Sequence, residues 1–415
     1  MVHGEAWTLK EFFVYPNEYI YWTIQIVMYP FMTGLVAGAF VLSSLYHVFG
    51  VKQLKEIARF SLVFSFALLP CAPLPLLLHL QQPLRNHHVL MTPHFSSAIA
   101  AFGIVFLTYG MIVASELWFV YRGHFVARAL ELRKEGRGVA DGLLARLFSL
   151  LTLGAWDVSE EALHKDEKAV KLLAGAGIPV ACFLHGYAGF IFGSVKANAL
   201  WMTPLMPVIF ICSAVVSGIA LCILSYVAVC KLRVLLHGRR TPDYGSHPGE
   251  APIGADLSIV AMTSRYLLIF LVLAISLELL DLIFRGYTAV KSWDILRSVI
   301  YEKDFFKIFI LQYGLGNLAP FILLTLPRLT VRRAVAGTLL VLLGVFMMRW
   351  NVVIGGQAFS ASFAGFMEYR LPIIPDSMET FREGLFGALF VVGMPYFFFY
   401  LISRVMPVFN PREHG

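Results

Sequence analysis

The chain has 415 residues, of which 58% are hydrophobic and 14% are charged. This composition excludes an ordinary soluble enzyme, and the hydrophobic residues form separate runs of about 20 residues, enough to cross a ~30 Å hydrocarbon core. The net charge of +7 comes mainly from loops between these runs. It therefore indicates membrane topology and gives no reason to expect nucleic-acid binding.

Nine apolar runs predict nine membrane spans in an all-α, polytopic fold. The runs are residues 20–47, 57–78, 96–121, 169–190, 204–229, 257–284, 305–326, 335–350 and 385–405. Residues 123–167 predict a basic cytoplasmic connection, within which residues 142–156 form an amphipathic surface helix or, alternatively, a short tenth span. The Pro- and Gly-rich residues 237–254 predict a flexible loop.

The basic residues predict the orientation of the spans. They gather in residues 52–59, 122–171, 231–240 and 328–333, which share one side of the membrane when nine spans alternate. Because Lys and Arg accumulate in cytoplasmic loops, this side is predicted to be cytoplasmic. The N-terminus then lies outside and the C-terminus inside.

The loop after the second run is rich in titratable residues. Its sequence, LHLQQPLRNHHVLMTPHF at 78–95, contains His79, Arg85, His87, His88 and His94. A redox carrier such as a quinone takes up and loses protons, and histidine can exchange them near neutral pH. We therefore interpret this loop as the main indication of function.

The predicted topology brings further polar residues to the same outer level. Gln25 lies near the outer end of the first span, His79 at that of the second, and His185 and Tyr187 at that of the fourth. Ionisable groups inside a membrane are costly, and they therefore indicate function by default. The alternative is that each histidine is an interfacial or hydrogen-bonded buried residue without a chemical role.

A second polar set lies later in the chain. Glu278 and Asp281 share one helix face near the outer end of the sixth span, and Arg349 reaches that of the eighth. We interpret these residues as part of a proton pathway or, alternatively, as a buried ion pair. Glu116 and Ser65 are predicted to extend the pathway towards the cytoplasm, and the alternative for Glu116 is a structural hydrogen bond between helices.

The cysteines give no indication of a metal centre. There are five, at Cys71, Cys182, Cys212, Cys222 and Cys230, and none forms a CxxC or CxxCH pattern. Iron–sulfur ligation and covalent haem attachment by this chain are therefore not expected. Each cysteine is interpreted as a small packing residue within or at the end of a span.

Four segments resemble, in the same order, the NrfD/polysulfide-reductase membrane-subunit family. They are PFMTGLVAGAF (30–40), LHLQQPLRNHHVLMTP (78–93), HGYAGFIFGSVKANALWMTPLMP (185–207) and RWNVVIGGQ (349–357). The ending RWNVVIGGQ and the length are most similar to the membrane subunits of periplasmic quinone reductase complexes of sulfate-reducing bacteria. The family usually has an acidic residue and Gly where this chain reads LHLQQP, so His79 stands in place of the acid.

The resemblance implies a single membrane domain, residues 1–415, in the bacterial inner membrane, with a periplasmic N-terminus and a cytoplasmic C-terminus. It implies two four-helix bundles at about 20–190 and 204–350 and an additional helix at 385–405. It also implies menaquinone as the bound substrate near the periplasmic face, with no haem or iron–sulfur cluster in this chain. The implied quinone-binding residues are Gln25, His79, Arg85, His185 and Tyr187.

The resemblance further implies partners. Electrons would come from a periplasmic iron–sulfur ferredoxin-like subunit, supplied by a molybdopterin-family subunit or by a multihaem cytochrome c, while membrane lipids surround the spans. The predicted function is that of a menaquinone-binding subunit of a respiratory oxidoreductase complex, without a redox centre of its own and with proton translocation left open. The alternatives are a redox-inactive anchor for the same complex, a secondary transporter, and a haem b protein that uses His79 and His185.

Overall fold

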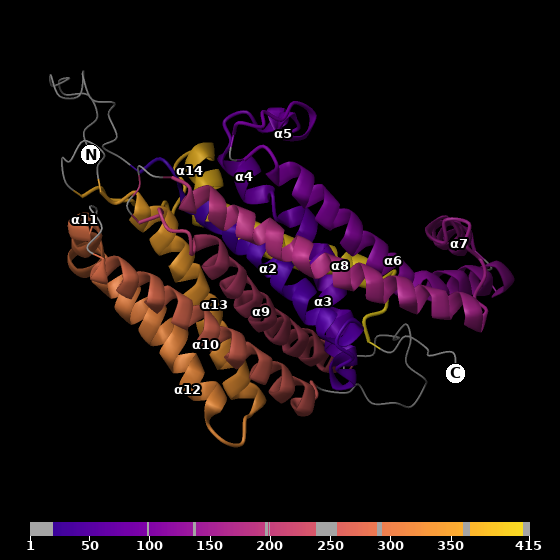
Figure 1. Cartoon of the computed structure of the whole chain (residues 1–415). Coiled ribbons are helices and arrows are strands. Elements are labelled where there is room, and N and C mark those ends of the chain that lie inside the picture. The colour runs from indigo at the N-terminus through magenta and orange to yellow at the C-terminus, as the bar shows by residue number, and fades with distance from the viewer. Residues whose placement is uncertain are drawn as a thin grey trace.

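The computed structural model describes residues 20–97, 99–135, 138–195, 198, 200–237, 255–288, 293–359 and 366–409. Within them, nine helical segments are long and apolar enough to cross a membrane, which confirms the prediction of an all-α polytopic protein. Figure 1 shows these helices side by side in one elongated bundle. The predicted loop at 237–254 lies outside the described residues, except for its first residue.

The first five spans are long, and their bounds differ from those expected at several ends. They are α2 (Ile24–His47), α3 (Lys55–Leu68) with α4 (Leu74–His79), α6 (Phe102–Glu135), α8 (Glu160–Gly193) and α9 (Met206–His237). The remaining four are α10 (Leu257–Tyr287), η5 (Phe306–Leu318) with α12 (Ala319–Thr325), α13 (Val331–Trp350) with η6 (Asn351–Gly355), and α15 (Leu385–Ser403).

The predicted connection at 123–167 is largely helical. Helix α6 continues to Glu135, and α8 already begins at Glu160, after Ser159 accepts a hydrogen bond from the backbone of Ala162 as an N-cap. Between them lies only α7 (Val139–Leu151), whose 13 residues are too few for a span. The described residues therefore hold nine candidate spans, and α7 is not a tenth.

Prolines interrupt the second span. The chain passes from α3 through the short η2 (Leu69–Cys71) into α4, and this stretch contains Pro70, Pro73 and Pro75. Proline lacks the backbone N–H that an α-helix requires, so the hydrogen-bond ladder cannot continue unbroken. The short helices η3 (Pro83–Arg85) and α5 (His88–Met91) follow in the loop.

Helices α2 and α9 form the centre of the bundle. The apolar stretches of these spans are 94% and 83% buried, and α2 packs against α3, α8, α9 and α13. The two helices cross at Gly38 and Gly218, where a side chain on either residue would collide with the opposite backbone. Polar side chains on α2 and α9 are consequently buried between helices.

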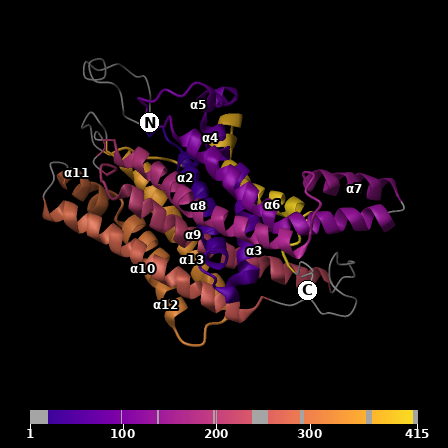
Figure 2. The same ribbon diagram turned by 45° about the vertical axis from the view of Figure 1, so that its right-hand side comes forward.

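The two ends of the bundle carry different short helices. Figures 1 and 2 show α5, α11 (Trp293–Arg297) and α14 (Met378–Glu383) at one end and α7 at the other. We call the first end the α14 end and the second the α7 end. Helix α14 begins with a capping box in which Ser377 and Thr380 bond to each other's backbone, which explains how so short a helix is held.

Several segments in the second half of the chain form π-helical turns. They are η4 (Ser298–Lys303), η5 and η6. Such turns are rare and are often found at functional sites. Two of them carry Gln312 and Asn351, the buried amides described below.

Candidate functional site

A fully buried pair, His185 on α8 and Arg349 on α13, lies at the centre of the molecule. Arg349 Nη2 is 2.9 Å from His185 Nε2, and the same nitrogen donates to Ser213 Oγ at 2.7 Å and to the carbonyl of Phe210 at 3.3 Å. His185 Nδ1 is 3.4 Å from Thr33 Oγ1 on α2. Four spans therefore contribute to one polar cluster.

The hydrogen bonds fix the protonation of the His185 ring. A guanidinium has only donors, so His185 Nε2 must accept from Arg349 and the ring proton must be on Nδ1. Nδ1 then donates to Thr33 Oγ1, whose own hydroxyl donates to the Tyr29 carbonyl at 3.0 Å. His185 is thus held as a neutral imidazole, with both ring nitrogens engaged in hydrogen bonds.

The charge of Arg349 is stabilised without a direct ion pair. Its guanidinium carbon lies 3.7 Å from the centre of the Phe210 ring, a cation–π contact that is stronger when desolvated. The ion pairs found among the described residues do not include Arg349. A positive charge held by dipoles and a ring favours a partly anionic or strongly polar group beside it.

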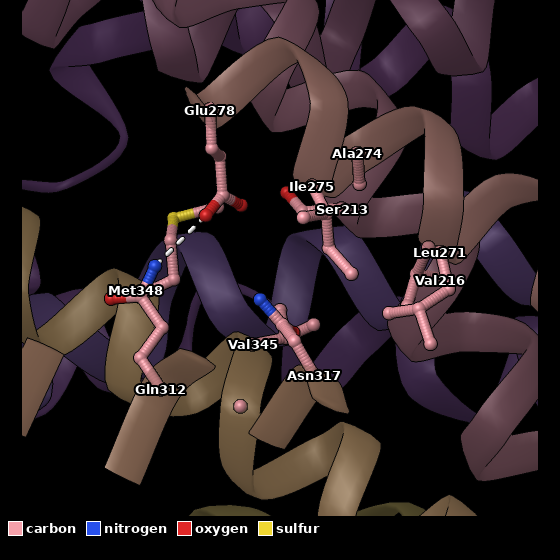
Figure 3. A pocket seen from close by; sticks show the side chains of 11 residues that line it. Ser213, Val216, Leu271, Ala274, Ile275, Glu278, Gln312, Asn317, Val345 and Met348 are labelled. Atoms are coloured by element: carbon pink, nitrogen blue, oxygen red, sulfur yellow. Dashed lines mark hydrogen bonds between the residues drawn. The ribbon is translucent and has the colours of Figure 1, made fainter. Parts of the chain in front are cut away.

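Glu278 belongs to a second polar chain that adjoins this cluster. Gln312 Nε2 donates to Glu278 at 2.9 Å, and Asn351 Nδ2 donates to Gln312 Oε1 at 2.7 Å. Figure 3 shows Glu278, Gln312 and Ser213 around one small pocket, which has room for about one water molecule. Ser213 lines this pocket and also accepts a hydrogen bond from Arg349, so the pocket connects Glu278 to the Arg349 cluster.

Asp281 has a different environment from Glu278. It forms an ion pair with Arg285 at 2.9 Å and accepts a hydrogen bond from Thr203 at 2.5 Å. The ion-pair partner of Asp281 is therefore Arg285, which lies outside the predicted polar set. Arg349 instead pairs with His185, so the residues of the predicted proton pathway fall into two environments.

A second site lies at the α14 end. His79 Nδ1 is 2.9 Å from Glu383 Oε2 and 3.4 Å from Thr23 Oγ1. Gln25 Nε2 donates to the carbonyl of Arg382 at 2.7 Å, and Gly387 leaves the space that this approach requires. Gln25 and His79, predicted to lie near each other, thus both contact the α14 segment.

Charge at this end favours an ionised Glu383. Burial alone would raise the pKa of Glu383, but hydrogen bonds and charge from His79, Thr23 and Arg382 hold that pKa below its usual value. Burial, with a contribution from the Glu383 charge, raises the pKa of Tyr369 to about 12. Tyr369 therefore stays neutral while Glu383 is ionised at neutral pH.

Helix α2 connects the two sites. Gln25, Tyr29 and Thr33 are spaced by four residues and follow one face of the helix over about 12 Å. Gln25 Oε1 and the Tyr29 hydroxyl are buried without a hydrogen-bond partner among the described residues. Buried polar atoms are rarely left unpaired, so these two are candidates to bind a ligand.

The other predicted quinone residues lie elsewhere. Tyr187 follows His185 by two residues and therefore faces another side of α8, where its ring lies 6.4 Å from that of Phe102. Phe102 in turn packs against Tyr29, with ring centres 5.6 Å apart. Arg85 is exposed in η3. The structure thus places Tyr187 near the α2 face and separates it from His185.

Glu116 and Ser65 lie in the interior of the bundle, among α2, α3 and α6. Both carboxylate oxygens of Glu116 are buried without a hydrogen-bond partner among the described residues. Ser65 donates to the Val36 carbonyl at 3.0 Å and lies 3.4 Å from the Tyr109 hydroxyl. An unpaired buried carboxylate is costly, so Glu116 is expected to carry a proton.

Sequence reasoning missed several members of these sites. They are Ser213, Tyr29, Gln312, Tyr369, Arg382 and Glu383. The sequence itself could have indicated Tyr29, because it lies four residues after Gln25 and therefore shares its helix face. Within the part of the chain that the structure describes, no group of three His, Cys, Asp or Glu side chains is placed to hold a metal ion.

Comparison with known proteins identifies the relatives of the chain. The sequence profile of the family described as "Polysulphide reductase, NrfD" matches residues 15–361. The C subunit of selenate reductase from Mesobacillus selenatarsenatis is 28% identical over 96% of this chain and 88% of its own length. A putative membrane C subunit of dimethyl sulfoxide reductase from Halobacterium salinarum is 27% identical over 77% of this chain and 65% of its own length. An Hdr-like menaquinol oxidoreductase integral membrane subunit of Archaeoglobus fulgidus is 24% identical over 48% of this chain and 40% of its own length.

Proposed function

The chain belongs to the polysulphide reductase NrfD family, and from this membership and its polar sites we propose that it is the quinone-binding membrane subunit of a respiratory oxidoreductase complex. The relatives named above are subunits of reductases, and one is named a menaquinol oxidoreductase subunit. The proposed substrate is menaquinone. The narrower likeness to periplasmic quinone reductase complexes stays a prediction.

The observation that carries the proposal is the polar face of α2. Gln25 Oε1 can accept a hydrogen bond from a quinol hydroxyl, and the Tyr29 hydroxyl can donate one to a quinone carbonyl. The aromatic rings of Phe102 and Tyr187 lie beside this face and suit a flat, apolar ring system. These residues would therefore bind and orient the quinone ring between α2, α6 and α8.

The electrons must come from another subunit, because the chain has no recognisable redox centre. We propose that the α14 end is periplasmic and that the loop at 81–95 contacts an iron–sulfur ferredoxin-like subunit there, supplied by a molybdopterin-family subunit or by a multihaem cytochrome c. Leu84, Met91 and Phe95 are exposed in or beside this loop, together with Arg85. Exposed apolar and basic side chains together suit a protein partner.

Protons can reach the proposed site from either side. Glu116 would supply them from the cytoplasmic half, with Ser65 and Tyr109 between it and α2. Glu278 would form a branch through the second half of the chain, connected to Arg349 through the pocket residue Ser213, and Asp281, on the same helix as Glu278, would extend it. The neutral His185 would position Arg349 and Thr33.

Replacing Tyr29 by Phe tests the proposal. The substitution removes a hydroxyl that bonds to no described residue, so it should leave assembly and thermal stability unchanged. If the hydroxyl binds quinone, the KM for a soluble menaquinone analogue should rise about 2- to 12-fold, as expected for one lost hydrogen bond of about 0.5–1.5 kcal/mol. The purified complex would be assayed with reduced viologen as electron donor.

Tyr121→Phe is the matched control. The Tyr121 hydroxyl donates to the Pro407 carbonyl at 3.0 Å, far from the α14 end, so its loss should lower stability and leave the KM unchanged. An unchanged KM in Tyr29→Phe would place the quinone elsewhere. A complex that reduces dyes but not quinone would support the anchor alternative.

A further inference from the structure

The C-terminal segment 366–384 covers the beginning of α2 and lies beyond the part of the chain that the family profile matches. The Tyr369 hydroxyl accepts a hydrogen bond from the backbone of Ile24 at 3.1 Å, and the Arg382 carbonyl accepts one from Gln25. The backbone of Leu385 donates to the Pro372 carbonyl at 3.0 Å, which ties the segment to the start of α15. The segment is thus bonded to Gln25, one of the two α2 residues that we assign to the quinone.

This segment brings Glu383 to His79. Their side chains are 13% and 21% exposed, so the pair is partly open to the surface, whereas His185 is fully buried. The other groups that face the pair are Arg382, 3.6 Å from Glu383, and the neutral Tyr369. Thr23 Oγ1 lies 3.4 Å from His79 Nδ1 and accepts a hydrogen bond from the backbone of Gln25, so the pair adjoins the proposed quinone site. A partly exposed histidine and carboxylate in contact can exchange protons with water.

We propose that Glu383 is a positioning residue for His79, and that the pair passes protons between the quinone site and the aqueous phase at the α14 end. The inference rests on the function proposed above. Reduction of a quinone to a quinol takes two electrons, which the partner subunit supplies, and two protons. The pair transfers one proton at a time and regains it from water, so it ends each cycle unchanged and carries no electron.

The carboxylate has two physical effects on the imidazole. It fixes the ring orientation by holding Nδ1, and it places an anionic oxygen 2.9 Å from that nitrogen, so that a proton can pass between the two atoms. Because the pKa of Glu383 is held below its usual value, this charge is present throughout the neutral range.

The test is the pH profile of quinone reduction by the assembled complex, with reduced viologen as donor and a soluble menaquinone analogue as acceptor. Glu383→Gln should lower turnover about tenfold at neutral pH and change the shape of the profile, because the amide carries neither the charge nor the exchangeable proton of the carboxyl group. Glu383→Asp should recover part of both effects. Glu379→Gln is the matched control on the same helix, since Glu379 is exposed, and it should match the wild type.

An unchanged profile in Glu383→Gln would overturn the inference while wild-type quinone reduction upholds the proposed function. A wild-type complex without quinone reduction would remove the proposed function and this inference with it. If Glu383→Gln does not assemble, His79→Gln gives the same information, because it removes the other member of the pair and should lower turnover and change the profile in the same way. A His79→Gln complex with the wild-type profile would overturn the pair.

Discussion

Replacing His185 by Gln or by Leu separates a fixed hydrogen-bonding role from an acid–base role. The amide of Gln can accept from Arg349 and donate to Thr33, as the neutral imidazole does. Leu has a similar size but offers neither group. If His185 acts only as a neutral hydrogen-bonding residue, Gln should replace it and Leu should not.

The expected magnitude follows from the contacts of Arg349 Nη2. In His185→Leu this nitrogen loses its 2.9 Å bond to the imidazole and keeps those to Ser213 and Phe210. One lost hydrogen bond to a buried charged group costs about 1.5–3 kcal/mol. Thr33 also loses its partner, although that contact is longer at 3.4 Å and contributes less. We therefore expect His185→Leu to lose stability by this amount and most of its quinone turnover.

The assay is the thermal transition of the purified complex together with its turnover on a menaquinone analogue. His185→Gln is expected to keep its free energy of unfolding within about 1 kcal/mol of the wild-type value. It is also expected to keep at least a third of the wild-type turnover. A stable His185→Gln complex that is as inactive as His185→Leu would refute the reasoning. That result would show that the imidazole itself takes up or releases a proton during the reaction.

Three further expectations concern other parts of the molecule. In proteoliposomes, quinone reduction by an external donor should generate a membrane potential. Glu116→Gln should lower this potential by a larger factor than it lowers the rate of electron transfer. Equal losses of potential and of electron transfer would remove Glu116 from the proton route. Photo-cross-linkers at the exposed Leu84 or Phe95 should capture an iron–sulfur subunit, and capture of cytoplasmic proteins would show that the orientation is inverted. Because the pKa of Glu383 lies below its usual value of 4.5, its ionised form stabilises the 366–384 segment above about pH 4.5, and this contribution is lost as the pH falls further. A spin label at the exposed Met378 should gain mobility below that pH, and constant mobility would contradict the pairing.

The spans could be predicted from the sequence because each depends on local composition. A run of about 20 apolar residues can satisfy its backbone only as a helix in lipid, and this holds without knowledge of its neighbours. The ends of α6 and α8 could not be predicted in the same way. Their polar extensions beyond the apolar runs depend on helix capping at Ser159 and on packing with α7.

The sites were predictable only as sets of polar residues at a common level. His79 and Gln25 were expected to share a site, and both contact the α14 segment, but Glu383 lies 304 positions from His79 and nothing local connects them. His185 and Tyr187 were grouped because they are close in sequence. A helix turns by about 100° per residue, so two residues apart means nearly opposite faces, and depth alone cannot distinguish them.

The central cluster has a geometric origin in the crossing of α2 and α9. Thr33 precedes the crossing glycine Gly38 by five residues, and Ser213 precedes Gly218 by five, so the two hydroxyls occupy equivalent positions on the paired helices. Thr33 bonds to His185, from the fourth span, and Ser213 bonds to Arg349, from the eighth span. The bond between His185 and Arg349 therefore joins the two halves of the chain at matching positions. Because these side chains are completely buried there, a change in the protonation or position of His185 acts directly on Arg349, and so on the helix that carries it.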